Sequence, residues 1–184
     1  MMRSSKRYVR SGAVLLVAGL LFGCADHEFQ QQAATVSLVN TSGANVGTAE
    51  LTEESKGVVT VRVAVRGLPP GTHGFHFHEV GVADPKASPP FSTSGEHYNP
   101  ASKRHGLSNP QGTHAGDLDN LLVDAQGNGT LLVTTNRITL SDGPNTLFDG
   151  NGSSLLIHVN TDDQVTDPSG NSGGRIAGGV VNRK

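Results

Sequence analysis

The segment GVVTVRVAVRGL (residues 57–68) alternates between valine and mostly polar residues, and this pattern decides the fold class. Val59, Val61, Val63 and Val65 fall on one side, and Thr60, Arg62, Ala64 and Arg66 fall on the other. A period of two residues with many β-branched side chains predicts a half-buried strand. Pro69-Pro70-Gly71 is expected to end it, because proline cannot donate a ladder hydrogen bond.

Other short segments carry the same kind of signal. Expected strands are 35–40, 45–52, 121–123, 130–134, 154–159 and 175–181, with turn residues between them. No segment shows a helical stripe, and the 24 glycines suit a chain with many tight turns. Regularly spaced short strands predict an all-β fold, an antiparallel sandwich or barrel. Two long polar segments, 81–116 and 160–174, are expected to be functional loops, because structureless loops of that length are uncommon in compact domains.

Seven of the eight histidines lie in five short motifs. These are GTHGFHFHE (71–79), GEHYNP (95–100), KRHG (103–106), HAGDL (114–118) and LIH (156–158). A single histidine in such a place is usually a buried, hydrogen-bonded residue. A series of them favours metal binding, because neutral imidazole is the commonest metal ligand in proteins.

The spacing separates the candidate ligands into two groups. His76 and His78 are two residues apart in a strand-like segment, so they project to the same face, and His158 on another strand can join them. An all-histidine group suits a redox metal such as copper. His97, His105, His114 and Asp117 form the second group. Three nitrogens and one carboxylate oxygen suit a structural, tetrahedral zinc ion.

The ordered motifs resemble copper/zinc superoxide dismutases over about residues 35–181. The matching segments are GFHFHE, GEHYNP, RHG, HAGDL, IHVNTDD and GNSGGRIAGGV. The resemblance implies a Greek-key antiparallel β-sandwich or barrel of about eight strands with two long functional loops. It also implies an enzyme, an oxidoreductase that converts superoxide to O₂ and H₂O₂ with copper and zinc as cofactors.

The resemblance also assigns roles to individual residues. It implies copper ligands at His76, His78, His97 and His158, and zinc ligands at His97, His105, His114 and Asp117. His97 would bridge the two metals and carry a proton, which makes it catalytic together with Arg175, the residue that would attract and hold the superoxide anion. Asp162 matches a carboxylate that links a copper histidine to a zinc histidine, and only one of Asp162 and Asp163 is expected to point inward. His73 matches a non-ligating histidine that braces the copper strand.

One departure from the family pattern is clear. Members usually carry a disulfide between the first long loop and the last strand, at positions that correspond here to Phe91 and Gly178. Cys24 is the only cysteine, so this bond cannot form, and a cross-link of such a loop is worth about 3–4 kcal/mol. Phe91 is expected to compensate partly by packing beneath the loop. The loop 160–174 also lacks Lys and Arg, which leaves the attraction of anions mainly to Arg175.

The N-terminal segment predicts export. Residues 1–10 carry four basic residues and no acidic one, and an apolar run follows at 13–22. That run is short for a membrane span and suits a signal peptide. LFGC (21–24) resembles a lipobox, so we expect a signal peptide at 1–23, lipidation of Cys24, a flexible tether at 25–34 and a single domain at 35–184. The expected location is the cell envelope, with the protein anchored in a membrane on its periplasmic or extracellular face.

Charge narrows the range of partners. Without the four basic residues of 1–23, 10 Lys and Arg remain against 16 Asp and Glu, a formal charge of −6. Nucleic acid is therefore excluded as an expected partner, because phosphate binding needs a basic surface. A monomer and a homodimer are both compatible with the sequence. The alternative to an enzyme is a non-catalytic envelope lipoprotein that binds copper and zinc.

Overall fold

The computed structural model describes residues 29–184 and is built from β-strands and loops. The expected signal peptide at 1–23, the lipidation site Cys24 and residues 25–28 of the expected tether lie outside the described residues. The strands are β1 (Gln32–Asn40), β2 (Asn45–Ser55), β3 (Val58–Val65), β4 (Gly71–His73), β5 (Phe75–His78), β6 (Leu121–Val123), β7 (Gly129–Thr135), β8 (Ser154–His158), β9 (Arg175–Val180) and β10 (Asn182–Arg183), with one 3₁₀ turn, η1 (Ser92–Ser94). This confirms the all-β prediction. From residue 29 onward, no helix is long and apolar enough to cross a membrane.

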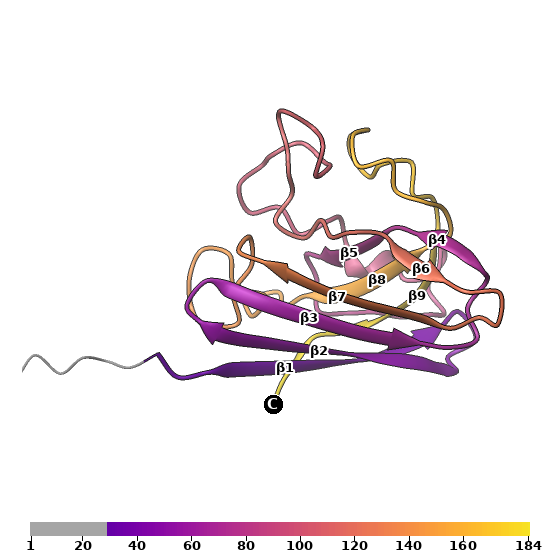
Figure 1. The fold of residues 1–184 in the computed structure, drawn as a ribbon, viewed down its shortest axis with the longest axis horizontal. Coiled ribbons are helices and arrows are strands. Elements are labelled where there is room, and N and C mark those ends of the chain that lie inside the picture. Colours follow the sequence, from indigo (N-terminus) through magenta and orange to yellow (C-terminus); the bar gives the residue numbers. More distant parts are fainter. Residues whose placement is uncertain (1–28) are drawn as a thin grey trace, which may run out of the picture.

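The sheet is an almost closed antiparallel barrel (Figure 1). Its strand order is β4-β6-β7-β3-β2-β1-β9-β8-β5, with β10 added beside β1. The two strands at its ends, β4 and β5, follow one another in the sequence and are separated only by Gly74. Neighbouring strands such as β3 and β7, or β1 and β9, are far apart in the sequence, as the predicted Greek-key topology requires.

The valine alternation in β3 places its apolar side in the barrel interior. Val59, Val61, Val63 and Val65 are buried in one cluster, as predicted, together with residues of β1, β2, β5, β8 and β9, and Leu131 and Val133 of β7 pack against it. The same alternation operates in β5, where Phe75 and Phe77 belong to the interior cluster. His76 and His78 therefore face outward, away from that cluster.

The strands differ from expectation mainly at the start of β1 and in two additional short strands, and β2 also continues to Ser55. β1 begins at Gln32, so the last three residues of the expected tether, 32–34, are part of a strand. They are held on both sides, since Ala34 pairs with Leu51 of β2 and with Arg183 of β10. The short strands β4 and β10 were not expected, because segments of two or three residues carry too little periodicity to detect.

Both predicted loops rise from the same side of the barrel (Figure 1). The first connects β5 to β6, and the second connects β8 to β9. β5 and β8 pair antiparallel, with Phe75 opposite Ile157 and His78 opposite Ser154, so the first loop leaves one end of this strand pair and the second loop leaves the other. Together the loops cover the outward-facing histidines of these strands, which are buried. This face contains the candidate site.

Candidate metal centre

Seven buried side chains form two groups that share one histidine. His76, His78, His97 and His158 make the first group, and His97, His105, His114 and Asp117 make the second. Within each group the candidate ligand atoms lie within 4.8 Å of one another. Every one of these residues is at most 5% exposed. The structure thus places the candidate ligands in the same two groups that the sequence predicts, and the two groups are adjacent.

The first group is positioned by strand pairing. His76 lies opposite Leu156 of β8, so His76, His78 and His158 share the outward face of the β5–β8 pair. His97 comes from the first loop, which is attached to β5 by a bridge between His78 and His97. The next residue, Tyr98, fixes the loop, because its ring lies in the interior cluster and its hydroxyl donates to the Thr146 carbonyl at 2.8 Å. Burial, followed by the charge of Asp149, raises the pKa of Tyr98 to about 12.

Hydrogen bonds to carbonyl oxygens fix the tautomers of two histidines. Nδ1 of His78 lies 3.0 Å from the Gly95 oxygen, and Nδ1 of His158 lies 3.0 Å from the Gly173 oxygen. A carbonyl oxygen only accepts, so each Nδ1 carries the proton and each Nε2 carries a lone pair. These two Nε2 atoms face one another at 3.4 Å. Two neutral acceptors at that distance need a cation between them, which is the clearest sign that the first group fits a metal ion.

Burial keeps the first group uncharged at neutral pH. It lowers the pKa of His158 to about 3, with the nearby His76 adding to the effect, and it lowers the pKa of His78 well below its usual range. The Nδ1 of His76 and the Nε2 of His97 are buried and have no hydrogen-bond partner within the described chain. Unprotonated, unpartnered ring nitrogens are the form that binds metals.

The second group is arranged around Asp117. Its Oδ1 lies 3.2, 3.0 and 3.4 Å from the Nδ1 atoms of His97, His105 and His114. Its Oδ2 accepts the N–H groups of Gly106 and His114 and the Thr113 hydroxyl. Burial opposes ionisation of Asp117, but the hydrogen bonds of the three histidines outweigh it and hold the pKa of this carboxyl far below its usual range. One fixed carboxylate oxygen among three imidazole nitrogens suits zinc.

His97 takes part in both groups through different atoms. Its Nδ1 faces Asp117, and its Nε2 has no partner, while its ring centre lies 4.0 Å from that of His76. Burial is the main reason why its pKa falls to about 4, against a smaller opposing effect of Asp117. A neutral imidazole with both nitrogens available to separate groups is able to bridge two ions.

Asp162 joins the two groups from the second loop. Its Oδ2 lies 2.7 Å from His76 Nε2, and its Oδ1 lies 3.0 Å from His105 Nε2. Burial disfavours its ionised form, but the bonds to His105 and His76 dominate and hold its pKa below the usual range. In return Asp117 and Asp162 overcome the burial of His105 and raise its pKa to about 9. The adjacent Asp163 is exposed, so only Asp162 points inward, as expected.

Comparison with known proteins identifies the family. Residues 45–181 match the family model described as copper/zinc superoxide dismutase (SODC). The chain is 41% identical over 168 residues to the protein named superoxide dismutase [Cu-Zn] 2 of Aquifex aeolicus (strain VF5), covering 90% of this chain and 96% of that relative. The chain belongs to the copper/zinc superoxide dismutase family.

Further relatives agree with this assignment. The superoxide dismutase [Cu-Zn] of Caulobacter vibrioides is 36% identical over 151 residues, covering 80% of this chain and 84% of the relative. The crystal structure of a SOD-like protein from Bacillus subtilis superposes with a TM-score of 0.73 at 38% identity, covering 79% of this chain and 96% of the other. The similarity extends across nearly all of the described barrel. The copper and zinc used by the family fit the two side-chain groups of this chain.

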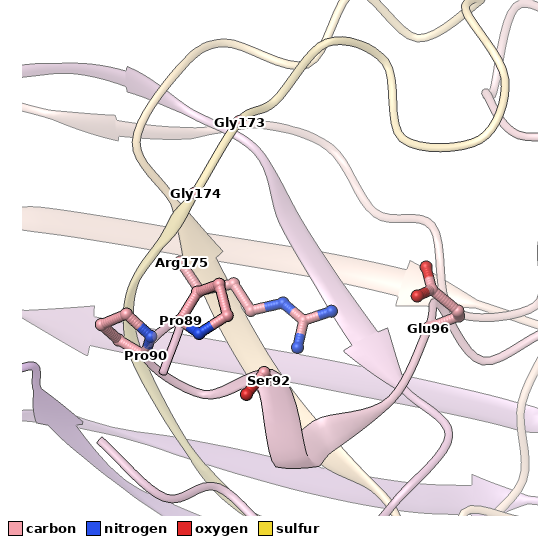
Figure 2. Close-up of a pocket in the computed structure, with 7 residues that line it drawn as sticks. All are labelled: Pro89, Pro90, Ser92, Glu96, Gly173, Gly174 and Arg175. Carbon is pink, nitrogen blue, oxygen red and sulfur yellow. The ribbon is translucent and has the colours of Figure 1, made fainter. Parts of the chain in front are cut away.

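The remaining predicted residues surround the centre of this family member. His73 lies outside both groups, because its Nδ1 is 2.8 Å from the His158 oxygen and its Nε2 is 2.8 Å from the Pro69 oxygen. Arg175 lines a pocket of about 280 Å³ with Pro89, Pro90, Ser92, Glu96, Gly173 and Gly174 (Figure 2). Its guanidinium donates to the carbonyl oxygens of Phe91 and Gly95. The Gly95 oxygen also accepts from His78, so one carbonyl connects the pocket to the first group.

Phe91 and Leu156 occupy the region where the family disulfide is missing. Both side chains are fully buried, yet neither belongs to the barrel-interior cluster, and Leu156 lies on the outward face. A Cβ at Gly178 would lie only 2.1 Å from Leu156 Cδ2, so this glycine makes room for the leucine. Phe91 is thus fully buried outside the interior cluster, and its carbonyl oxygen accepts a hydrogen bond from Arg175.

Three supporting residues were not recognised in the sequence. Asn120 holds Asp162 by two bonds of 2.9 Å to its main-chain N–H and oxygen. Arg137 donates to the Asp117 carbonyl at 2.6 Å. Gly170 has a φ of +60°, and a Cβ there would lie 1.7 Å from Asp162 Oδ1. Most of these contacts involve main-chain atoms of distant segments, which leave no residue pattern to detect.

Replacement of Gly170 tests the dependence of the centre on Asp162. Gly170→Ala must displace the Asp162 carboxylate from His105, so we expect zinc and copper to be held about 10- to 100-fold more weakly, as measured by competition with a chelator. Gly174→Ala is the matched control, because a Cβ there has no neighbour within 4 Å. Equal metal affinities in the two variants would contradict this role of Asp162.

Replacement of Phe91 tests the apolar anchor of the first loop. Phe91→Ala removes a fully buried ring, so we expect the free energy of unfolding to fall by about 3 kcal/mol and zinc to be lost more readily. Val82→Ala, in the same loop but 47% exposed, should change it by about 0.5 kcal/mol or less. Denaturant unfolding of the metal-loaded proteins measures the stability of both variants. If Phe91→Ala is as stable as the wild type, Phe91 does not anchor the loop.

Proposed function

We propose that this chain dismutates superoxide, converting two anions and two protons to O₂ and H₂O₂. The observation that carries the proposal is the pair of lone-pair nitrogens of His78 and His158, 3.4 Å apart, next to a histidine shared with a second group. Membership of the family and the names of the relatives support the same activity.

The ligand atoms follow from the tautomers and free nitrogens. Copper would be held by Nδ1 of His76 and by Nε2 of His78, His97 and His158. Zinc would be held by Nδ1 of His97, His105 and His114 and by Oδ1 of Asp117. When bound, copper supplies one-electron oxidation and reduction, and zinc holds the shared imidazole.

The chain's own residues supply the remaining chemistry. Arg175 is fixed by two carbonyl oxygens and presents its other N–H groups to the pocket, where they bind and orient an anion by charge-assisted hydrogen bonds. When His97 Nε2 is free of metal, this buried atom holds a proton and releases it to the peroxide product. The covering loops exclude bulk water from the ring nitrogens.

The test uses residues 25–184 loaded with copper and zinc, with metal content quantified. We expect catalytic turnover of superoxide with kcat/KM on the order of 10⁸–10⁹ M⁻¹s⁻¹ at one copper and one zinc per chain. Arg175→Gln should lower kcat/KM by about 10- to 100-fold with unchanged metal content, because the local positive charge is lost. Arg62→Gln, an exposed charge on β3, is the control and should leave the rate unchanged.

The opposite outcome also has a clear meaning. Both metals bound with only stoichiometric reaction would refute the catalytic proposal. The protein would then be a non-catalytic copper/zinc-binding lipoprotein. The sedimentation of the same material distinguishes a monomer from a homodimer.

We also propose that the protein is exported and anchored in a membrane of the cell envelope through a lipidated Cys24. The basic N-terminus, the apolar run 13–22 and the LFGC motif support this. We expect the full-length chain in the membrane fraction and Cys24→Ser in the soluble or uncleaved fraction, measured by fractionation with metabolic lipid labelling. Unlabelled, soluble wild-type protein would refute the anchor.

A further inference from the structure

The pocket that contains Arg175 also contains one acidic side chain. Arg175 and Glu96 are the charged residues among the seven that line it, and the others are prolines, glycines and a serine. Figure 2 shows the Glu96 carboxylate and the Arg175 guanidinium set apart across the pocket. We propose that Glu96 sets the charge selectivity of this pocket, admitting monoanions and disfavouring multiply charged anions. This inference rests on the proposed function, whose substrate is a monoanion.

The two charges do not neutralise each other by direct pairing. Arg175 directs two N–H groups to the carbonyl oxygens of Phe91 and Gly95. Lys86, in the same loop as Glu96, donates to the carbonyl oxygens of Thr41 and Ser42 and so is directed to the turn after β1. Glu96 therefore acts on an anion in the pocket as a separate negative charge.

The position of Glu96 is fixed by its main chain. Its carbonyl oxygen accepts the Glu79 N–H at 3.0 Å, and its own N–H donates to the Glu79 carboxylate at 3.2 Å. The following residue is the buried His97. The Glu96 side chain is exposed at the rim and is held near the pocket by the same loop geometry that places His97.

A second hollow adds negative charge at this rim. It has a volume of about 320 Å³ and is lined by the carboxylates of Glu79, Glu96 and Asp167, together with Lys103 and the edges of His97 and His114. Arg104 pairs with Asp167 at 3.2 Å, so Lys103 and Arg104 offset part of this charge and the carboxylates remain in excess. Glu96 lines both hollows. The second loop, 160–174, contributes no Lys or Arg to offset these charges.

The selectivity follows from how electrostatic energy depends on ligand charge. Attraction to Arg175 doubles from a monoanion to a dianion, so an arginine alone would favour sulfate or phosphate over a monoanion. Repulsion from Glu96 doubles in the same way and offsets that advantage. A monoanion keeps the direct hydrogen bonds to Arg175 and has the smaller penalty. Glu96 thus reduces the advantage that a competing dianion would have at the arginine.

Anion binding tests the proposal without using turnover. The reduced protein loaded with copper and zinc is diamagnetic, so the Arg175 Nε–H resonance can follow titrations with nitrate and with sulfate. We expect Glu96→Gln to tighten nitrate about twofold and sulfate about fourfold, since the factor for a dianion is the square of that for a monoanion. Glu96→Asp keeps the charge and should retain the wild-type values.

A charge-matched variant provides the control. Glu54→Gln removes the same charge from an exposed position near the end of β2, next to Glu53, which pairs with Gln32 at the start of β1. Strand β9, which carries Arg175, pairs with Val39 and Asn40 at the other end of β1, so Glu54 lies far from the pocket. Glu54→Gln should alter neither affinity. The proposal would be overturned if Glu96→Gln changed the affinities for nitrate and sulfate by the same factor, or if Glu54→Gln changed them as much as Glu96→Gln does. Selective anion binding without superoxide turnover would leave the proposal intact and refute the proposed function instead.

Discussion

The Asp162 carboxylate between His76 and His105 is the interaction on which the centre depends. It joins a histidine of strand β5 to a histidine of the first loop, and it comes from the second loop, so three segments meet at two oxygen atoms. A buried carboxylate is stable only when its oxygens are satisfied. The ring nitrogen of each histidine that binds Asp162 is no longer available as a metal ligand, so the other nitrogen of the ring is left to face a cation.

The barrel provides the fixed surface that this interaction needs. Gly74 alone separates the edge strands β4 and β5, and its carbonyl oxygen accepts the His158 N–H while its own N–H donates to Asn160. The place where the barrel almost closes therefore lies beside the ligands of the first group. Ring positions depend on the β5–β8 register, and a slip of one residue would direct the histidines into the hydrophobic interior.

Most of the strands, and the shared face of His76 and His78, could be predicted because they depend on local periodicity, whereas the second group was predicted from its motifs, its donor types and the resemblance to the family. The valines of β3 alternate with the pleat, and His76 and His78 share a face for the same reason. The supporting residues follow no such rule. Asn120 and Arg137 act on the main chain of Asp162 and Asp117, and Gly170 matters through the absence of a side chain. The start of β1 at Gln32 depends on pairing with β2 and β10, which a polar segment does not reveal.

The anchoring of the first loop has a consequence for the conditions in which the protein works. Disulfide bonds in general form and persist most readily in oxidising compartments. Here the loop is held by the buried ring of Phe91 and by hydrogen bonds from Arg175 to its carbonyl oxygens, none of which exchanges electrons with thiols. The only cysteine, Cys24, lies outside the barrel sequence. The geometry of the anion pocket is therefore independent of the thiol–disulfide balance of its surroundings, and reductants such as glutathione have no bond to break there.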